Sequence, residues 1–331
     1  MINKPWLLLP PQWAHDLGPF GLKLYTLYAD LFHSGPTPEW KSFTWNNLHF
    51  KNPLGLAGGV DKNAESLNEW WTLGAGFVEV GTVTPLPQKA NPGKIMDRNL
   101  ERKALWNKMG FPSHGANEVF FNLRDYEEKQ TPVFINIGKN RDTANEDAGE
   151  DYLYLINKFK SVADAFVVNI SSPNTKGLRD LQNKTALTKL LAPLVKASHG
   201  GVITPILLKL SPDLQDEQLE EALGVAVELG IDGFVLTNTT LSRPQGIPFP
   251  PEGGLSGAPL KPLSCSILQK SLQILGKHRS GKLIISAGGA MTPEDVFERL
   301  QMGADLVEIY SALIFEGPGF FRNVAARYSG R

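Results

Sequence analysis

The sequence predicts an α/β fold, a (β/α)8 TIM barrel with an N-terminal amphipathic helical extension. Apolar runs of strand length recur along the chain, each ending in or near Gly, Ser, Thr or Asn, and amphipathic stretches lie between them. Eight such runs in alternation with helical stretches favour a closed parallel barrel. A doubly wound open sheet is the alternative that this alternation leaves open.

The expected strands span most of the chain. They are Asn52–Gly59, Phe77–Val83, Val133–Gly138, Ala165–Ser171, Pro205–Ser211, Gly233–Thr239, Leu283–Gly289 and Leu306–Ala312. The helices expected between them include Asp180–Ala197, Glu217–Leu229 and Pro293–Met302. A chain of 331 residues with 42% hydrophobic content suits one large barrel, and no linker, repeat or low-complexity tract marks a second catalytic domain. We therefore expect an extension at residues 1–42 and a barrel at residues 43–331.

The extension lacks the strand pattern. It contains two short amphipathic segments rich in aromatic residues, broken by Pro10-Pro11 and ended by Gly35-Pro36. Neither segment approaches the ~18 apolar residues that cross a bilayer, and the run Trp6–Leu9 is too short for a secretory signal. Two interpretations remain open, a helical lid packed on the barrel and an apolar helical pair that dips into a membrane surface.

Composition excludes several classes of site and partner. A net charge of −1 gives no reason to expect a nucleic-acid partner. The single cysteine, Cys265, excludes an internal disulfide and a CxxC metal site, and it suits a reducing compartment. We expect no bound metal.

The segment from Val167 to Thr175 is the strongest indication of catalysis. An apolar strand runs directly into small polar side chains, and Pro173 ends the strand where these groups would face a ligand. Taken alone, the segment fits an ordinary Asx or Ser turn equally well. Amides recur, however, at or just beyond the ends of three expected strands, at Asn136, Asn169, Asn174 and Asn238. Their fixed donors and acceptors suit a planar heterocycle.

Charged residues and glycines extend this pattern. Lys62 follows Gly58-Gly59, where the backbone can approach a ligand closely, although a tight turn explains the glycines too. Lys209 ends an apolar strand, so it needs a negative partner such as a reduced flavin or a carboxylate, unless it reaches solvent. Gly254–Gly257, Ala287–Gly289 and Tyr310-Ser311 fall where such barrels commonly bind a phosphate.

Seven motifs occur in the order found in one known family. They are Asn52–Lys62, Glu79–Pro85, Asn107–Phe111, Ile135–Asn140, Asn169–Thr175, Thr237–Thr240 and Gly253–Gly257. On these motifs, and from about Trp6 to Arg327, the chain resembles the dihydroorotate dehydrogenases, specifically their quinone-linked, membrane-associated second class. The resemblance implies a (β/α)8 barrel that binds one FMN per subunit, with an N-terminal helical extension.

The resemblance also implies the site residues. FMN is expected against Gly58, Gly59, Val60, Asp61, Lys62, Thr82, Asn136, Asn169, Lys209, Thr237, Gly257, Gly289, Tyr310 and Ser311. Substrate is expected against Lys62, Asn107, Lys108, Met109, Gly110, Phe111, Asn169, Asn174, Asn238 and Thr239. The implied reaction oxidises (S)-dihydroorotate to orotate in pyrimidine biosynthesis, as a base takes the C5 proton and C6 passes hydride to the flavin. Ser172 matches the base, with Thr175 and Phe111 beside its water path. Lys209 would stabilise the reduced flavin, and Lys62 the substrate carboxylate.

Two features indicate the quinone-linked class. Relatives that use soluble acceptors have cysteine as the base, where this chain has Ser172. The extension resembles the helical pair by which a membrane quinone reaches the flavin, which favours the membrane interpretation. We expect a peripheral protein on the cytoplasmic side of a bacterial inner membrane. Departures from the family pattern occur at Gly58, Leu86, Trp106 and Lys108, and none of them touches the expected base.

Two other classes of function remain as alternatives. An isomerase or aldolase could use the phosphate site, with Lys209 forming a Schiff base. A non-catalytic membrane scaffold is the second alternative, and the density of polar strand ends speaks against it.

Overall fold

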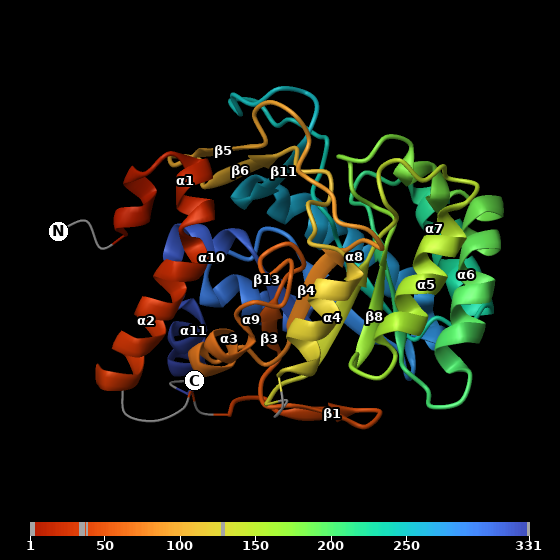
Figure 1. Ribbon diagram of the computed structural model, residues 1–331, viewed down its shortest axis with the longest axis horizontal. Helices are drawn as coiled ribbons and strands as arrows, with labels where there is room; N and C mark the ends of the chain where they lie inside the picture. The colour runs from red at the N-terminus through yellow and green to blue at the C-terminus, as the bar shows by residue number, and fades with distance from the viewer. Residues whose placement is uncertain (1–3, 33–36, 38, 127–129, 330–331) are drawn as a thin grey trace.

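The expected strands close into a parallel barrel (Figure 1) in the computed structural model, which describes residues 4–32, 37, 39–126 and 130–329. Its strands are β3 (Leu54–Leu56), β4 (Val78–Val83), β7 (Val133–Ile137), β8 (Ala165–Asn169), β9 (Ile206–Leu210), β10 (Gly233–Leu236), β12 (Leu283–Ala287) and β13 (Leu306–Ile309). The order around the barrel is β10-β12-β13-β3-β4-β7-β8-β9, and β9 closes onto β10 in parallel. The barrel prediction is confirmed, and the open sheet is excluded.

Helices surround the barrel. They are α3 (Leu67–Leu73), α4 (Ala116–Arg124), α5 (Ala148–Phe159), α6 (Lys184–His199), α7 (Asp216–Glu228), α8 (Lys261–Leu275), α9 (Pro293–Gln301), α10 (Ser311–Glu316) and α11 (Phe320–Ser329). Short 3-10 helices are η2 (Leu178–Gln182), η3 (Ala258–Leu260) and η4 (Gly276–Arg279). The expected helix Asp180–Ala197 is in fact split between η2 and α6, because Oδ1 of Asn183 accepts a hydrogen bond from the N–H of Ala186 and starts a new helix.

A hairpin closes one end of the barrel. Strands β1 (Phe43–Trp45) and β2 (Leu48–Phe50) pair in antiparallel fashion and lie at the bottom of Figure 1. The ring of Phe50 packs edge-on against the rings of Phe77 and Phe134, with centroid distances of 6.1 and 6.2 Å. These aromatic contacts fill the interior at the amino ends of the strands. The carboxyl ends are left for the site.

A three-stranded antiparallel sheet lies over the opposite end. It consists of β5 (Met96–Asn99), β6 (Ala104–Asn107) and β11 (Gly254–Gly257), in the order β11-β6-β5. The segment Gly254–Gly257, expected around a barrel strand end, is therefore a strand of this sheet, and Gly257 pairs with Ala104. Long connections after β4 and β10 supply these strands, and the simple βα pattern could not reveal them.

The extension forms η1 (Pro5–Leu8), α1 (Pro11–Asp16) and α2 (Gly18–Phe32). The expected break at Pro10-Pro11 is present, whereas the expected end at Gly35-Pro36 lies outside the described residues. The first part docks on the barrel, since the Trp6 indole donates to the carbonyl of Ile314 at 2.8 Å and Lys4 lies 2.6 Å from Glu316.

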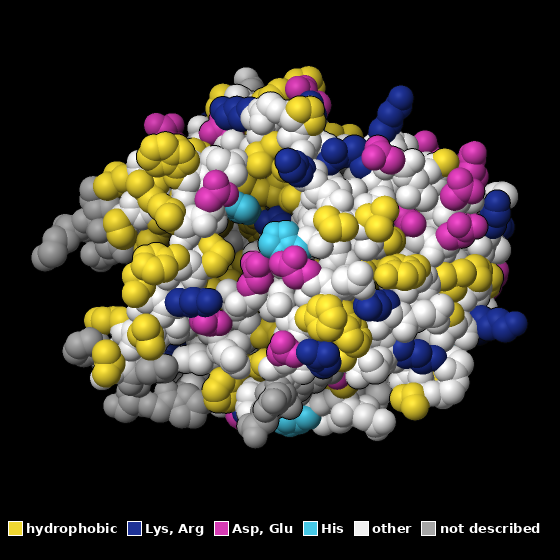
Figure 2. Space-filling model, viewed as in Figure 1, with side chains coloured by type: hydrophobic (Ala, Val, Ile, Leu, Met, Phe, Trp, Pro, Cys, Tyr) yellow, Lys and Arg dark blue, Asp and Glu magenta, His cyan; other side chains and the backbone are white. Residues whose placement is uncertain are grey.

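Helix α2 presents an apolar surface to solvent. Half of the large apolar side chains that are exposed in the described part lie in the extension, and Figure 2 shows yellow side chains gathered over its helices at the left. They are Leu8, Trp13, Leu17, Phe20, Leu24, Leu27, Tyr28 and Leu31. Within the ranges that the structure describes, no helix is both long and apolar enough to span a membrane.

Candidate active site

A pocket lies at the carboxyl ends of the barrel strands and gathers most of the expected site residues. Those that line it are Gly58, Gly59, Lys62, Thr82, Asn107, Met109, Gly110, Phe111, Asn169, Ser172, Asn174, Lys209, Thr237, Asn238, Thr239, Gly289, Tyr310 and Ser311. They come from strand ends around the barrel other than that of β7, and from β6, so only the closed fold brings them together. The position agrees with the end of the barrel at which such enzymes carry their chemistry.

Five expected residues lie outside this lining, namely Val60, Asp61, Lys108, Asn136 and Gly257. The carboxylate of Asp61 accepts hydrogen bonds from the N–H groups of Glu65 and Ser66 and so organises the turn before α3. The side chain of Lys108 is 40% exposed and lies 3.9 Å from Glu252. In the structure, the side chain of Asp61 therefore stabilises a turn and that of Lys108 lies at the protein surface.

The strand-end amides form one hydrogen-bonded network. The amide of Asn169 donates to Thr82 Oγ1 at 3.0 Å and to Asn136 Oδ1 at 3.1 Å. The amide of Asn238 donates to Asn169 Oδ1 at 3.2 Å and to Ser171 Oγ at 3.1 Å. Asn136 therefore supports the pocket from behind, because its partner Asn169 lines the pocket and Asn136 does not. Such mutual bonding fixes the direction in which each amide can meet a ligand.

Two carboxylates partner the buried Lys209. Its Nζ lies 2.7 Å from Glu79 Oε1 and 3.4 Å from Glu308 Oε2, and Glu79 also accepts a hydrogen bond of 2.6 Å from Asn136. Burial alone lowers the pKa of Lys209, but Glu308 and Glu79 outweigh it and hold that pKa above its ordinary value. The permanent charge disfavours a Schiff-base role for Lys209, because a nucleophilic amine must first lose its proton.

Glu308 is the main site residue that our sequence reasoning missed. It lines the pocket, and its Oε1 is buried without a hydrogen-bond partner in the described part of the chain. Burial and the neighbouring Glu79 raise the pKa of Glu308 well above its ordinary value. A signal was present, since Glu79 and Glu308 each interrupt an apolar strand. The other unexpected lining residues are Ala57, Pro112, Leu260, Ala290 and Ile309, whereas Ser256, Ala287 and Gly288 belong to the segments expected at a phosphate site.

Lys62 meets the extension inside the pocket. Its Nζ lies 2.9 Å from Nε2 of His15, which belongs to α1. Burial lowers the pKa of Lys62 to about 8, although Asp61 and Asp16 oppose the shift. Burial also lowers the pKa of His15, and the nearby Lys62 lowers it further. At neutral pH the pair is therefore a charged lysine beside a neutral imidazole.

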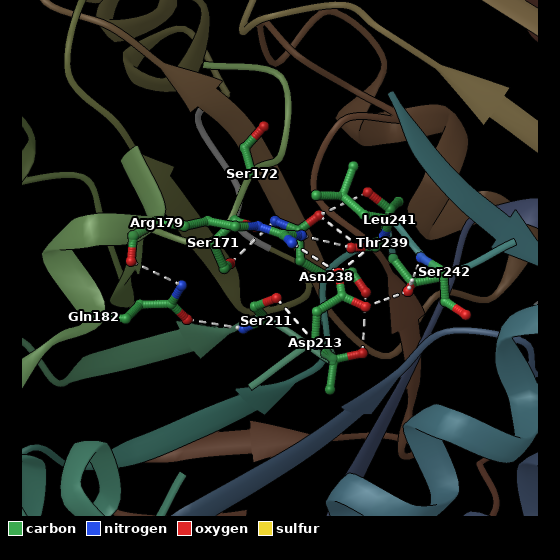
Figure 3. Close-up of polar contacts among 12 residues, drawn as sticks. Ser171, Ser172, Arg179, Gln182, Ser211, Asp213, Asn238, Thr239, Leu241 and Ser242 are labelled. Carbon is green, nitrogen blue, oxygen red and sulfur yellow. Dashed lines mark hydrogen bonds and ion pairs between the residues drawn. The ribbon is translucent and has the colours of Figure 1, made fainter. Parts of the chain in front are cut away.

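Ser172 is buried in the pocket wall just beyond β8. Its Oγ accepts a hydrogen bond of 3.2 Å from the N–H of Asn174, and in Figure 3 its side chain points away from the polar cluster beneath it. The neighbouring Asn174 donates to Asn107 Oδ1 at 2.8 Å, while its own Oδ1 is buried without a partner in the described residues. Ser172 is thus both accessible to a ligand and held by its own loop.

Arg179 ties this loop to two other strand ends (Figure 3). Its guanidinium donates to the carbonyls of Ser171 and Thr239, each at 2.9 Å, and lies 2.7 Å from a carboxylate oxygen of Asp213. Asp213 in turn accepts from Oγ1 of Thr240 and from the N–H of Leu241. One ion pair therefore fixes the loops that follow β8, β9 and β10. Sequence reasoning did not identify it.

The loop Asn107–Phe111 covers one side of the pocket. Phe111 has a φ of 56°, a left-handed conformation that a bulky residue rarely adopts. The Gln88 side chain donates to the carbonyls of Gly110 and Phe111, at 3.1 and 2.8 Å, and stabilises this conformation. Strain retained in this way is common where a loop must hold a ligand.

Comparison with known proteins agrees with this geometry. The sequence model of the family "Dihydroorotate dehydrogenase" matches residues 42–328. A "Dihydroorotate dehydrogenase (quinone)" from Thermus thermophilus is 44% identical over 282 residues, which cover 84% of this chain and 79% of that protein. A protein of the same name from Stenotrophomonas maltophilia is 39% identical over 337 residues, which cover 96% and 92%.

A solved structure from Eimeria tenella, described as ligand-free type DHODH, is similar over 96% of this chain and 93% of that one. Its TM-score is 0.82 and its sequence is 34% identical. The strand order, the gathered strand-end residues and these matches lead to one conclusion. The chain belongs to the dihydroorotate dehydrogenase family.

Proposed function

We propose that the protein oxidises (S)-dihydroorotate to orotate in pyrimidine biosynthesis, with FMN as its cofactor and a membrane quinone as the electron acceptor. The observation that carries this proposal is the convergence of Ser172, Lys62 and the amide network in one pocket. The names of the relatives support the substrate and the acceptor.

The lining residues fit a flavin mononucleotide. Two buried acceptor atoms at the pocket, Asn174 Oδ1 and Glu308 Oε1, lack partners in the described part, so a ligand with polar edges would satisfy them. The backbone of Gly58, Gly59 and Gly289 lines the pocket, and at Gly58 and Gly289 a side chain would clash with Glu79 and Lys261. We assign the flavin ring to the part of the pocket lined by Thr82, Asn169, Lys209 and Thr237. The flavin phosphate is assigned to the part formed by Gly257, Gly289, Tyr310 and Ser311. Asn136 and Asp61 support the pocket from outside its lining.

Each protein group has a distinct task in the proposed reaction. A flavin held in this pocket would supply the acceptor for the hydride that leaves C6 of the substrate. Ser172 takes the C5 proton while its own hydroxyl proton leaves along the expected water path beside Thr175 and Phe111, and its place in a fixed loop keeps the hydroxyl directed into the pocket. The ammonium of Lys62 holds the substrate carboxylate, and the amides of Asn107, Asn169, Asn174 and Asn238 orient the ring. The ammonium of Lys209 stabilises negative charge that develops nearby, and Glu79 keeps it in place.

The proposed domain organisation assigns residues 1–42 to membrane and quinone access and residues 43–331 to the barrel. The helices of the extension precede β1, which begins at Phe43, and the exposed apolar face of α2 suits the surface of a bilayer. This assignment supports peripheral attachment, which we propose is to the cytoplasmic side of a bacterial inner membrane.

The proposal is tested by the absorbance spectrum of the purified protein. We expect a flavin spectrum that bleaches on anaerobic addition of dihydroorotate and returns with a soluble quinone analogue. NAD and fumarate should restore it poorly. A colourless protein would support the isomerase or aldolase alternative, and efficient turnover with fumarate or NAD would contradict the quinone-linked class.

A further inference from the structure

Arg299 on α9 is almost completely buried, with 1% of its surface exposed. Its guanidinium donates to Ser286 Oγ at 2.8 Å, to Ser264 Oγ at 2.9 Å and to the carbonyl oxygen of Gly288 at 2.8 Å. Its Nε is buried and has no hydrogen-bond partner in the described part of the chain. All three partners are neutral, so none of them balances the charge.

No carboxylate among the described residues lies within ion-pair distance of Arg299. The two acidic residues that act on it from further away, Glu298 and Asp295, both contact Nζ of Lys261, at 2.7 and 2.5 Å. The neighbouring Cys265 adds no negative charge, because burial raises the pKa of its thiol. An arginine stays protonated even when buried, so Arg299 is a buried cation that only these more distant carboxylates offset, and burial without a direct ion pair is costly.

The contact with Gly288 leads to the pocket. The carbonyl of Gly288 accepts from both Arg299 and Ser264, and it is thereby held on the side of the guanidinium. In a trans peptide the C=O and the following N–H point in opposite directions, so the N–H of Gly289 is turned away from Arg299. Gly288 and Gly289 both line the pocket, with φ values of 104° and 79° that only glycine adopts readily.

We propose that Arg299 is a positioning residue for the phosphate of the bound flavin, placing positive charge behind the Gly288-Gly289 turn and fixing the peptide whose N–H faces the phosphate. Arg299 acts through the carbonyl of Gly288 and does not touch the flavin. The phosphate then adds a further anion to the distant carboxylates of Glu298 and Asp295 that offset the buried charge. This inference rests on the proposed binding of FMN.

The test compares FMN with riboflavin, which has the same ring and ribityl chain but no phosphate. The full-length protein is freed of flavin and titrated with each compound, with binding followed by flavin fluorescence. The parent should prefer FMN. Arg299→Met should weaken FMN binding roughly 10- to 100-fold, as expected for loss of a charge-assisted interaction, and change riboflavin binding less than about 3-fold.

Two further variants separate charge from packing. Arg299→Lys keeps the charge and should retain most of the preference for FMN, so it also serves if the methionine variant does not fold. Arg327→Met is the matched control. It removes a guanidinium of α11 that pairs with the exposed Glu294 of α9, the helix that carries Arg299. It should bind both flavins like the parent.

The outcomes are distinct. An equal loss of affinity for both flavins in Arg299→Met or Arg299→Lys, or no loss of FMN affinity in Arg299→Met, overturns the inference. A parent that binds neither flavin contradicts the proposed function itself and removes the inference with it.

Discussion

Nε2 of His15 lies 2.9 Å from Nζ of Lys62, so the N-terminal extension makes direct contact with the residue assigned to the substrate carboxylate. The contact joins α1 to the loop after β3, two parts of the chain that the sequence pattern treats separately. Lys62 is consequently enclosed, and the enclosure is the reason for its lowered pKa.

Orotate binding should therefore weaken at alkaline pH. The pKa of Lys62 is about 8 in the folded protein against 10.5 in an unfolded chain, so the attractive ammonium is lost as the pH rises through 8. Affinity for orotate should fall about 10-fold per pH unit above that value. Titration of the flavin spectrum with orotate between pH 6 and about 9.5 measures this. Lys62→Arg, which stays charged, should show a flat profile, and an equally steep profile in that variant would contradict the assignment.

Ser172→Ala should keep flavin and orotate binding but slow reduction of the flavin by dihydroorotate by roughly 10²- to 10⁴-fold, as expected for a positioned base. Binding survives because Asn169 and Asn174 hold the ring. Rapid mixing under anaerobic conditions gives the rate. Ser171→Ala is a neighbouring comparison, although it removes one hydrogen bond to Asn238 and one to Asn169. Reduction of the Ser172→Ala flavin at the parent rate would mean that the base lies elsewhere.

Arg179→Met should impair the same step indirectly. The change frees the carbonyls of Ser171 and Thr239 and leaves Asp213 without its cation, so the loops after β8 and β10 lose their common anchor. We expect flavin reduction to slow about 10-fold and unfolding to become easier by about 1–3 kcal/mol. The half-reaction and denaturant unfolding measure the two effects. Arg124→Met removes an exposed ion pair instead and should change neither quantity.

Glu308→Gln should stabilise the protein at neutral pH. The pKa of Glu308 is raised in the folded state, whereas an unfolded glutamate ionises near 4.5. The folded protein thus retains a proton that the unfolded chain releases, and the stability of the parent falls as the pH rises above about 4.5. Glutamine resembles the neutral acid and removes this penalty. Thermal unfolding should show a higher Tm for the variant at pH 7 and equal values near pH 4. A lower Tm at pH 7 would mean that Lys209 needs an ionised Glu308.

Deletion of residues 1–36 should separate the two half-reactions. Every proposed flavin and substrate contact begins at Gly58 or later, so dihydroorotate should still reduce the flavin. Turnover with long-chain quinone and sedimentation with liposomes should fall. Because the deletion also uncovers barrel surface, the two half-reactions are compared in one preparation.

A milder change tests the same apolar face. Phe20→Ser with Leu27→Ser should reduce liposome binding, since both side chains are more than half exposed on α2. Tyr154→Ser with Val202→Ser, at exposed positions on the barrel, should leave it unchanged. If the deletion and the Phe20→Ser, Leu27→Ser variant both kept full liposome binding and full quinone turnover, the extension would be only a packed lid.

The sequence predicts the barrel well because each strand carries its own signal, an apolar run ending in small polar residues. The split between η2 and α6 was missed because Asn183 caps a helix inside a continuous amphipathic pattern. In the small sheet β11-β6-β5, the pairing of β11 with β6 was missed because it joins segments about 150 residues apart, and periodicity reports only local order.

The candidate site divides in a similar way. Ser172 and the amides were found because they stand at strand ends. Glu308 and Arg299 were not, because their importance depends on neighbours in space, the ammonium of Lys209 and the carbonyl of Gly288. A charge inside an apolar strand was a local sign for Glu308, whereas Arg299 follows Glu298 in a helix rich in charged residues and has no such sign.

The hairpin of β1 and β2 has a consequence for how the protein tolerates mutation. Its aromatic plug closes the end of the barrel opposite the pocket, so the molecule has a structural pole and a chemical pole. Substitutions at Phe43, Phe50 or Phe77 should lower the thermal stability of the protein, while substitutions at the carboxyl ends of the strands should lower its turnover rate. Substitutions in the aromatic hairpin should therefore leave the geometry of the pocket unchanged, because the two ends of the barrel are built from different residues.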